Sequence, residues 1–252
     1  MKEEAQTWVY EAGERIRVML RSTLEIDTKS NENDLVTNAD KETETFLVNK
    51  IKKSYPDHKI LGEEGIADDV RDMEGHVWII DPIDGTMNFV HFQRFYAISL
   101  ALYLNGQPLF GYVYDVYSDE LYFAEHNNGA YINGKRLKPL EPKPLNTSII
   151  SLNTDYLFNK PSLTSIIDRV RGVRTFGVCS LEMAFVASGK IDAFISDSLS
   201  AWDYSAGKIL VEETGGRVVS QQNEAIHYLT KQEIVVSNPS ILQDILSITK
   251  NA

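Results

Sequence analysis

Residues Trp78–His91, with the sequence WIIDPIDGTMNFVH, carry the strongest structural and chemical signal in the chain. A run of apolar, strand-forming residues ends there in two aspartates three positions apart, Asp81 and Asp84. Pro82 fixes φ and Gly85 permits a sharp turn, so we expect the two carboxylates to be held on a stiff turn. Hard divalent cations such as Mg²⁺ prefer oxygen ligands, and two acids on one turn can share a pair of ions. A strand followed by an ordinary loop explains the same residues, since Asp-Pro and Asp-Gly are common turn dipeptides.

Two further acidic segments have surroundings that fit a metal site. Upstream, the glutamates Glu63 and Glu64 lie between two glycines, just after a short apolar run. Downstream, Asp203 stands at the start of a helical pattern that runs towards Gly215 and Gly216. Each has a plain alternative: a solvated loop for the glutamates, and helix capping or a favourable first-turn charge for Asp203. Acids on loops beside regular elements are nevertheless what a metal cluster requires.

Four ordered segments carry a family resemblance. They are GEEG at 62–65, DPIDGTMNFVH at 81–91, AWDYSAG at 201–207, and Lys29 followed by DLVTNAD at 34–40. With these segments the chain resembles the inositol monophosphatase family of Mg²⁺-dependent, lithium-sensitive sugar-phosphate phosphatases, with landmarks from Lys29 to Gly216. The resemblance implies a layered αβαβα sandwich, of mixed α+β and α/β character, and a homodimer.

The resemblance also implies the metal ligands. Glu63, Asp81 and the carbonyl oxygen of Ile83 are expected to hold one Mg²⁺. Asp81, Asp84 and Asp203 are expected to hold a second ion, with Asp81 bridging the two. A third, loosely held ion is expected to rest on Glu63 and water. The site would therefore take two or three Mg²⁺ ions.

Catalytic roles follow from the same correspondence. Thr86 and Asp40 match the pair that orients and deprotonates the attacking water, and the backbone amides of Gly85 and Thr86 are expected to receive phosphate oxygens at a helix start. The catalytic residues so implied are Asp40, Glu63 and Thr86. The residues expected to support them from behind are Lys29 and Glu64.

The substrate side departs from the family pattern. The implied substrate contacts are Asp84, Gly85, Thr86, Gly177, Val178, Cys179, Ser196 and Asp203. Where the family has Gly-Ser/Thr-Ala, this chain has Gly177-Val178-Cys179. Where inositol-specific animal members carry a glutamate seven residues before the last ligand, this chain has Ser196. We therefore expect an intact catalytic centre with an altered polyol clamp.

The expected function is metal-activated hydrolysis of small polyol, sugar or nucleotide phosphates, as in an inositol-1-monophosphatase. The same fold acting mainly on NADP, 3′-phosphoadenosine phosphate or fructose bisphosphate is an alternative, as is a non-catalytic inositol-phosphate or metal-binding regulator. A route through an aspartyl-phosphate is a third possibility, since DPIDGT superficially resembles the D-x-D-x-T motif of haloacid dehalogenases. That motif needs acids two apart, whereas Ile83 stands at that position here.

Composition limits the partners. The chain has 252 residues, a net charge of −11, 43% hydrophobic and 24% charged residues, as in an ordinary globular protein. The negative charge argues against binding of nucleic acid or anionic membranes. The resemblance implies a small phosphomonoester as the partner, and bound cations would offset the repulsion between its phosphate and the acidic protein. Cys179 is the only cysteine, so no intrachain disulfide can form, and the N-terminal sequence lacks the apolar core of a signal peptide. We expect a cytoplasmic protein.

The secondary-structure pattern divides the chain into two halves. An N-terminal α+β half, residues 1–140, should carry the DPIDGT motif, and a C-terminal α/β half, residues 141–252, should carry Asp203 and the substrate contacts. Helices are expected at about 3–22, 40–55, 162–170, 180–188, 202–214 and 241–248. Strands are expected within 77–132, including a hairpin at Asn105-Gly106, and at 148–152, 191–195, 217–219 and 233–236.

Overall fold

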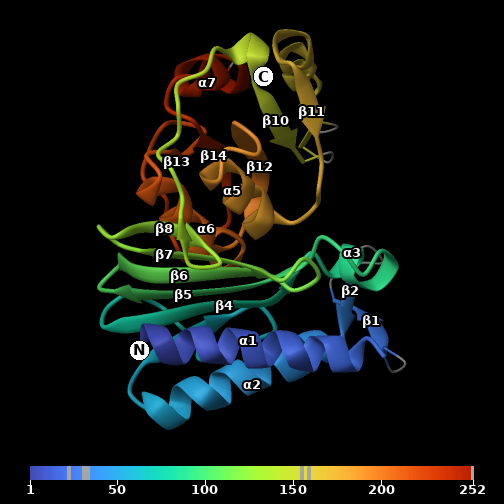
Figure 1. Cartoon of the computed structure of the whole chain (residues 1–252), viewed down its shortest axis with the longest axis vertical. Coiled ribbons are helices and arrows are strands. Elements are labelled where there is room, and N and C mark those ends of the chain that lie inside the picture. Colours follow the sequence, from blue (N-terminus) through green and yellow to red (C-terminus); the bar gives the residue numbers. More distant parts are fainter. Residues whose placement is uncertain (22–23, 30–34, 154–155, 158–159, 251–252) are drawn as a thin grey trace.

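The computed structural model describes residues 1–21, 24–29, 35–153, 156–157 and 160–250. Asp34, the first residue of the DLVTNAD segment, lies outside the described residues. The described part of the chain forms five layers, which alternate between helices and sheets (Figure 1). The predicted αβαβα sandwich is therefore confirmed. The division into halves at residue 140 stays a prediction.

The first two layers are a helix pair and a seven-stranded sheet. The pair is α1 (Lys2–Met19) and α2 (Asn38–Ser54). The sheet consists, in spatial order, of β3 (Lys59–Gly62), β4 (His76–Asp84), β5 (Ala97–Leu104), β6 (Gln107–Asp115), β7 (Glu120–Glu125), β8 (Gly129–Ile132) and β9 (Lys135–Arg136). Only β3 and β4 pair in parallel. The hairpin predicted at Asn105 and Gly106 is confirmed, and both residues have the positive φ that such a tight turn requires.

The remaining layers contain two helices, a second sheet and an outer helical layer. The inner helices are α5 (Cys179–Ala187) and α6 (Ala201–Glu213). The five-stranded sheet has the order β11 (Gly172–Arg174), β10 (Ile149–Leu152), β12 (Ala193–Leu199), β14 (Gln232–Ser237) and β13 (Arg217–Ser220). The outer layer is η2 (Pro161–Arg169) and α7 (Leu242–Lys250). The shorter elements are β1 (Ile26–Thr28), β2 (Leu35–Thr37), α3 (Thr86–His91) and η1 (Leu145–Thr147).

Alternation along the strands explains the layering. In β4, Val77 and Ile79 belong to the central core with α5 and α6, whereas Trp78 and Ile80 face α1 and α2. Successive side chains of a strand point to opposite faces, so a continuous apolar run must be covered on both sides. The second sheet repeats this pattern, with Phe194 in the central core and its neighbours in the outer core. The strand β4 is therefore buried between two helical layers.

Two sequence predictions for this second half were wrong in detail. The helix expected at 162–170 is a 3₁₀-helix, η2, in which Leu163 and Ile166 are both buried. Their separation of three residues matches the three residues per turn of a 3₁₀-helix. The strand expected at 191–195 is displaced to Ala193–Leu199, because Asp192 lies before it and accepts the amide proton of Ile149 on the neighbouring strand.

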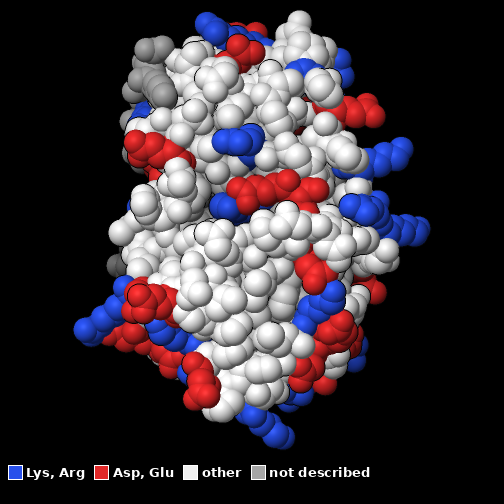
Figure 2. Space-filling model, turned by 90° about the vertical axis from the view of Figure 1, so that its left-hand side faces the viewer, with Lys and Arg blue, Asp and Glu red and all other residues white. Residues whose placement is uncertain are grey.

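Figure 2 shows the charged side chains on one face of the molecule. On the face shown in Figure 2, acidic and basic side chains lie scattered among uncharged ones. No helix in the described part of the chain is long and apolar enough to cross a membrane.

Candidate metal centre and active site

The end of β4 holds the two aspartates of the central motif. Asp81 and Asp84 are both buried, and the pairing of β4 with β5 is interrupted between them. The carboxylate of Asp81 accepts the amide proton of Ile83 at 3.1 Å. Gly85 then takes a left-handed conformation with φ of 87°, and α3 begins at the next residue. The local sequence therefore places two carboxylates at the end of one strand, as the motif predicts.

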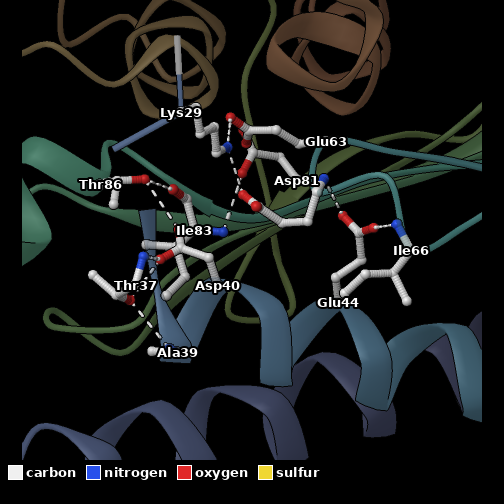
Figure 3. A network of polar contacts seen from close by, with 11 residues as sticks. Lys29, Thr37, Ala39, Asp40, Glu44, Glu63, Ile66, Asp81, Ile83 and Thr86 are labelled. Carbon is white, nitrogen blue, oxygen red and sulfur yellow. Dashed lines mark hydrogen bonds and ion pairs between the residues drawn. The ribbon is translucent and has the colours of Figure 1, made fainter. Parts of the chain in front are cut away.

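Asp40 and Thr86 are brought together from distant segments. Asp40 occupies the third position of α2 and closes a capping box, in which one of its oxygens accepts from the backbone amide and hydroxyl of Thr37 at 2.8 and 2.6 Å. The hydroxyl of Thr86 lies 3.1 Å from the other oxygen of Asp40 and 3.1 Å from the carbonyl oxygen of Ile83 (Figure 3). Burial raises the pKa of Asp40, against the lowering effect of these hydrogen bonds. The arrangement can accept a proton through the hydroxyl of Thr86.

The glutamate loop faces the same point. Lys29 donates to Glu63 at 2.9 Å and to Glu64 at 2.6 Å, so the two acids share one cation. The side chain of Glu64 is only 3% exposed. Burial raises the pKa of Glu64 to about 7, although the ion pair with Lys29 opposes the shift. Figure 3 shows Glu63, in the loop after β3, and Asp81, in β4, pointing towards one another.

Asp203 joins the cluster from the other half of the chain. It is the third residue of α6 and accepts the amide proton of Ser200 at 2.7 Å, so the capping role considered from the sequence is real. Burial, followed by repulsion from Asp84 and Glu63, raises its pKa well above the usual range. Asp203 therefore caps a helix and contributes charge to the site at the same time.

The acids repel one another. Burial raises the pKa of Asp81, and the nearby charges of Glu63, Asp84 and Asp203 raise it further. Burial likewise raises the pKa of Asp84 to about 7, even though Ser180 stabilises its charged form. Among the described residues, no three acidic, histidine or cysteine side chains converge closely enough to form a ready-made metal shell. The fit to a metal therefore rests on the all-oxygen donors and on this uncompensated charge, both of which suit a hard divalent cation.

The segment before α5 packs directly on the DPIDGT turn. The amide of Ser180 donates to Asp84 at 2.6 Å, across 96 residues of sequence. The side chain of Asn88 donates to the carbonyl oxygen of Phe176 at 2.7 Å. Val178 is buried against Gly85, where an added Cβ would lie 2.6 Å from its methyl group. The predicted substrate segment Gly177–Cys179 thus borders the acidic cluster.

Two predicted substrate residues have restricted side chains. Burial raises the pKa of the Cys179 thiol well above its usual range, and the fields of Asp84 and Asp203 add to this, so the thiol stays protonated. Ser196 is fully buried in β12, with its hydroxyl 3.4 Å from the carbonyl oxygen of Asp197. Asp197 itself is only half-buried and is the more accessible of this pair. Direct substrate contact by Ser196 stays a prediction.

Two buried glutamates near the site were missed from the sequence. Glu44 accepts the amide protons of Glu64 and Ile66 at 2.8 and 3.1 Å. Glu182 accepts the hydroxyl of Ser151 at 2.6 Å and the amide of Phe176 at 2.9 Å. The available signals were an acid one turn after Asp40 and a lone acid in the apolar run of α5.

Comparison with known proteins agrees with this geometry. The profile of the inositol monophosphatase family matches residues 1–251. The chain is 46% identical to the inositol-1-monophosphatase of Bacillus subtilis, over 95% of this chain and 92% of that protein. A staphylococcal inositol monophosphatase-1, in a LiCl-soaked inhibitory complex, superimposes with a TM-score of 0.92 at 28% identity, covering 98% of this chain and 93% of the other. An IMPase/NADP phosphatase complexed with Mg²⁺ and phosphate gives 0.91 at 28% identity, covering 98% and 94%. On this evidence the chain belongs to the inositol monophosphatase family.

Proposed function

We propose that this phosphoric monoester hydrolase uses Mg²⁺ to cleave small polyol, sugar or nucleotide phosphates, with inositol 1-phosphate among them. One observation carries the proposal: Asp81 and Asp84 are buried and Asp203 is half-buried, and burial together with repulsion from neighbouring acids, Glu63 among them, raises the pKa of each. Such a cluster gains most from divalent cations, which would also counter the net negative charge of the protein towards a phosphate substrate.

The ligands divide into two sets. Glu63, Asp81 and the carbonyl oxygen of Ile83 would hold one Mg²⁺, and Asp81, Asp84 and Asp203 a second. Bound Mg²⁺ supplies charge neutralisation at phosphorus, a more acidic water and support for the leaving oxygen. The absence of histidine and cysteine from this donor set favours a hard cation over zinc.

The water is activated by Thr86 and Asp40. The hydroxyl of Thr86 would take a proton from the attacking water while giving its own to Asp40, 3.1 Å away. The water oxygen would then bond to phosphorus as the ester P–O bond breaks, and the leaving oxygen would take up a proton from solvent and depart as the alcohol. The backbone amides of Gly85 and Thr86 are the proposed phosphate contacts. Lys29, held between Glu63 and Glu64, supports the acidic loop from behind.

Metal removal tests the proposal. Protein dialysed against EDTA should not hydrolyse inositol 1-phosphate, and Mg²⁺ should restore activity. Millimolar Li⁺ should lower it again. Phosphate release measured by a colorimetric assay checks each step. Full turnover in metal-free buffer would overturn the proposed mechanism.

We also propose that the chain forms a homodimer in the cytoplasm. Four exposed apolar side chains lie around α3 and the β6–β7 turn, namely Met87, Phe92, Phe95 and Tyr117. Phe92 and Tyr117 line one hollow together with Arg94, whose guanidinium lies 4.7 Å from the Tyr117 ring centroid. Light scattering should give a mass twice the 28.5 kDa of one chain. In a Phe92→Ser variant the measured mass should fall towards that of one chain. A monomeric parent would contradict the dimer.

A further inference from the structure

Glu44 is a buried carboxylate one turn beyond Asp40 on α2, and it lies behind the loop that carries Glu63 and Glu64. One of its oxygens accepts the amide of Glu64 at 2.8 Å and the other accepts the amide of Ile66 at 3.1 Å (Figure 3). The two hydrogen bonds fix the backbone on both sides of Gly65. Glu44 therefore determines where the loop stands above α2.

The glycine at position 62 is matched to this carboxylate. A Cβ added to Gly62 would lie 2.7 Å from the carboxyl carbon and from both oxygens of Glu44. Real Cβ atoms do not approach so closely, so any larger residue at 62 would displace the carboxylate. The strand end β3 and the buried acid consequently form one unit.

A buried charge at this position costs free energy unless hydrogen bonds or an ion pair compensate it. Burial raises the pKa of Glu44, and the amides of Glu64 and Ile66 counteract that shift by stabilising the charged form. Glutamine at 44 would keep one acceptor and turn a donor towards the second amide, so one buried N–H would lose its partner. The contacts of Glu44 are thus specific to a carboxylate.

We propose that Glu44 is a positioning residue that sets the Mg²⁺ affinity of the Glu63 site by holding residues 63–66 in place. This inference rests on the proposed function, because it takes Glu63 as a metal ligand. Residues behind a metal's own ligands orient them, and their loss typically weakens metal binding about 10- to 100-fold. Glu44 would touch neither the phosphate nor the attacking water.

The test compares Glu44→Gln with Glu42→Gln, an exposed glutamate two residues away on the same helix. In metal-free protein, hydrogen exchange of the Glu64 and Ile66 amides should quicken about tenfold or more in Glu44→Gln alone. Titration calorimetry should show Mg²⁺ binding weakened about tenfold or more, with kcat at saturating Mg²⁺ within about threefold of the parent. Glu42→Gln should match the parent in all three measurements.

The outcomes separate the two proposals. Parent protein that binds no Mg²⁺ would overturn the proposed function. If the parent binds Mg²⁺ and the Glu44→Gln variant binds it as tightly as the Glu42→Gln variant, the role of Glu44 is overturned and the proposed function stands. If Glu44→Gln does not fold, Gly62→Ala provides the same measurement, since its Cβ displaces the carboxylate; unaltered Mg²⁺ affinity in that variant would equally overturn the inference.

Discussion

At the scale of single residues, the acids of this site each do two things. Asp40 and Asp203 both occupy the third position of a helix, where they complete capping boxes with Thr37 and Ser200. For Asp203 the sequence presented capping and function as alternatives, yet a carboxylate has two oxygens and can serve both. Asp40 uses one oxygen for the cap and leaves the other for the hydroxyl of Thr86.

Substitutions at Thr86 and Asp84 should separate chemistry from metal binding. Thr86→Ala should bind Mg²⁺ as the parent does, while kcat falls by roughly 10²–10⁴, because the acceptor for the water's proton is lost. Asp84→Asn should weaken Mg²⁺ binding and lower kcat by on the order of 10³ or more, because a ligand charge is removed. Calorimetry beside steady-state kinetics distinguishes the two patterns.

Thr45→Ala is the matched control, because the Thr45 hydroxyl is exposed on α2 and bonds only to the carbonyl oxygen of Lys41 at 2.7 Å among the described contacts. It should change neither quantity. A Thr86→Ala variant as active as this control would show that the hydroxyl has no part in activating water.

At the scale of elements, the turn between β4 and α3 is closely packed and depends on a glycine. Gly85 has φ of 87°, which is a strained conformation for any residue with a side chain. Two neighbours also leave no room for a side chain at this position. A Cβ added to Gly85 would lie 2.6 Å from a methyl group of Val178 and 2.9 Å from the carbonyl oxygen of Phe95. The turn therefore fixes the strand end, the short helix and the segment before α5 together.

Gly85→Ala should destabilise the fold through both effects. The positive φ alone costs about 1–3 kcal/mol, and the contacts with Val178 and Phe95 add to that cost. Gly134→Ala is the control: its φ is 75°, but nothing lies within 4 Å of the added Cβ. Urea unfolding should show a larger loss for Gly85→Ala than for Gly134→Ala by at least about 1 kcal/mol. Equal losses would mean that the contacts at Gly85 yield without cost.

At the scale of the whole molecule, the site lies between the seven-stranded sheet and the helices α5 and α6. Asp81 and Asp84 come from the seven-stranded sheet, whereas Asp203 and Ser180 come from helices packed between the sheets. Bringing these acids together stores electrostatic repulsion in the folded protein. Stability and metal binding should consequently be linked.

That linkage predicts an unusual pH dependence for the metal-free protein. In the fold the pKa values of Asp84 and Glu64 rise to about 7, and burial and repulsion raise those of Asp81 and Asp203 too, whereas an unfolded Asp or Glu titrates near 4. Between pH ~4 and 7 the folded state thus binds more protons than the unfolded state, so stability falls as pH rises. His58, whose pKa is lowered by burial and by His76, opposes this trend as a single group.

Urea denaturation in EDTA should give a lower midpoint at pH 7.5 than at pH 5.5. Saturating Mg²⁺ should remove or reverse the difference, because it binds only the folded, deprotonated cluster. If the metal-free protein is more stable at pH 7.5 than at pH 5.5, the acids do not repel one another in the folded state.

Substrate selectivity should be weak across the molecule's candidate esters. The proposed metals and amides hold the phosphate that all of them share, whereas Val178 offers no side-chain hydrogen bond and Ser196 is fully buried. A single polar contact is worth ~1–3 kcal/mol, so kcat/KM should stay within about two orders of magnitude across small phosphomonoesters.

Inositol 1-phosphate, 2′-AMP, glycerol 2-phosphate and NADP form a suitable series for steady-state kinetics. Inositol 1-phosphate should be hydrolysed without standing far above the others. A preference of roughly 10⁴ for one ester would contradict this weak selectivity, and the half-buried Asp197 beside Ser196 would then be the first residue to substitute.

The sequence by itself determined the order of the elements, because that order depends on local spacing, and its resemblance to a known family pointed to the acids proposed as metal ligands. A strand alternates every second residue, and Asp81 and Asp84 share a turn whatever surrounds them. Tertiary structure alone decided which distant groups donate hydrogen bonds to the buried acids. The bonds from Thr86 to Asp40, from Ser180 to Asp84 and from Glu64 to Glu44 join residues 46, 96 and 20 positions apart. No local pattern encodes such partners, since they follow from how whole layers pack, and an acid without its partner looks like any other charged residue in a helix or loop.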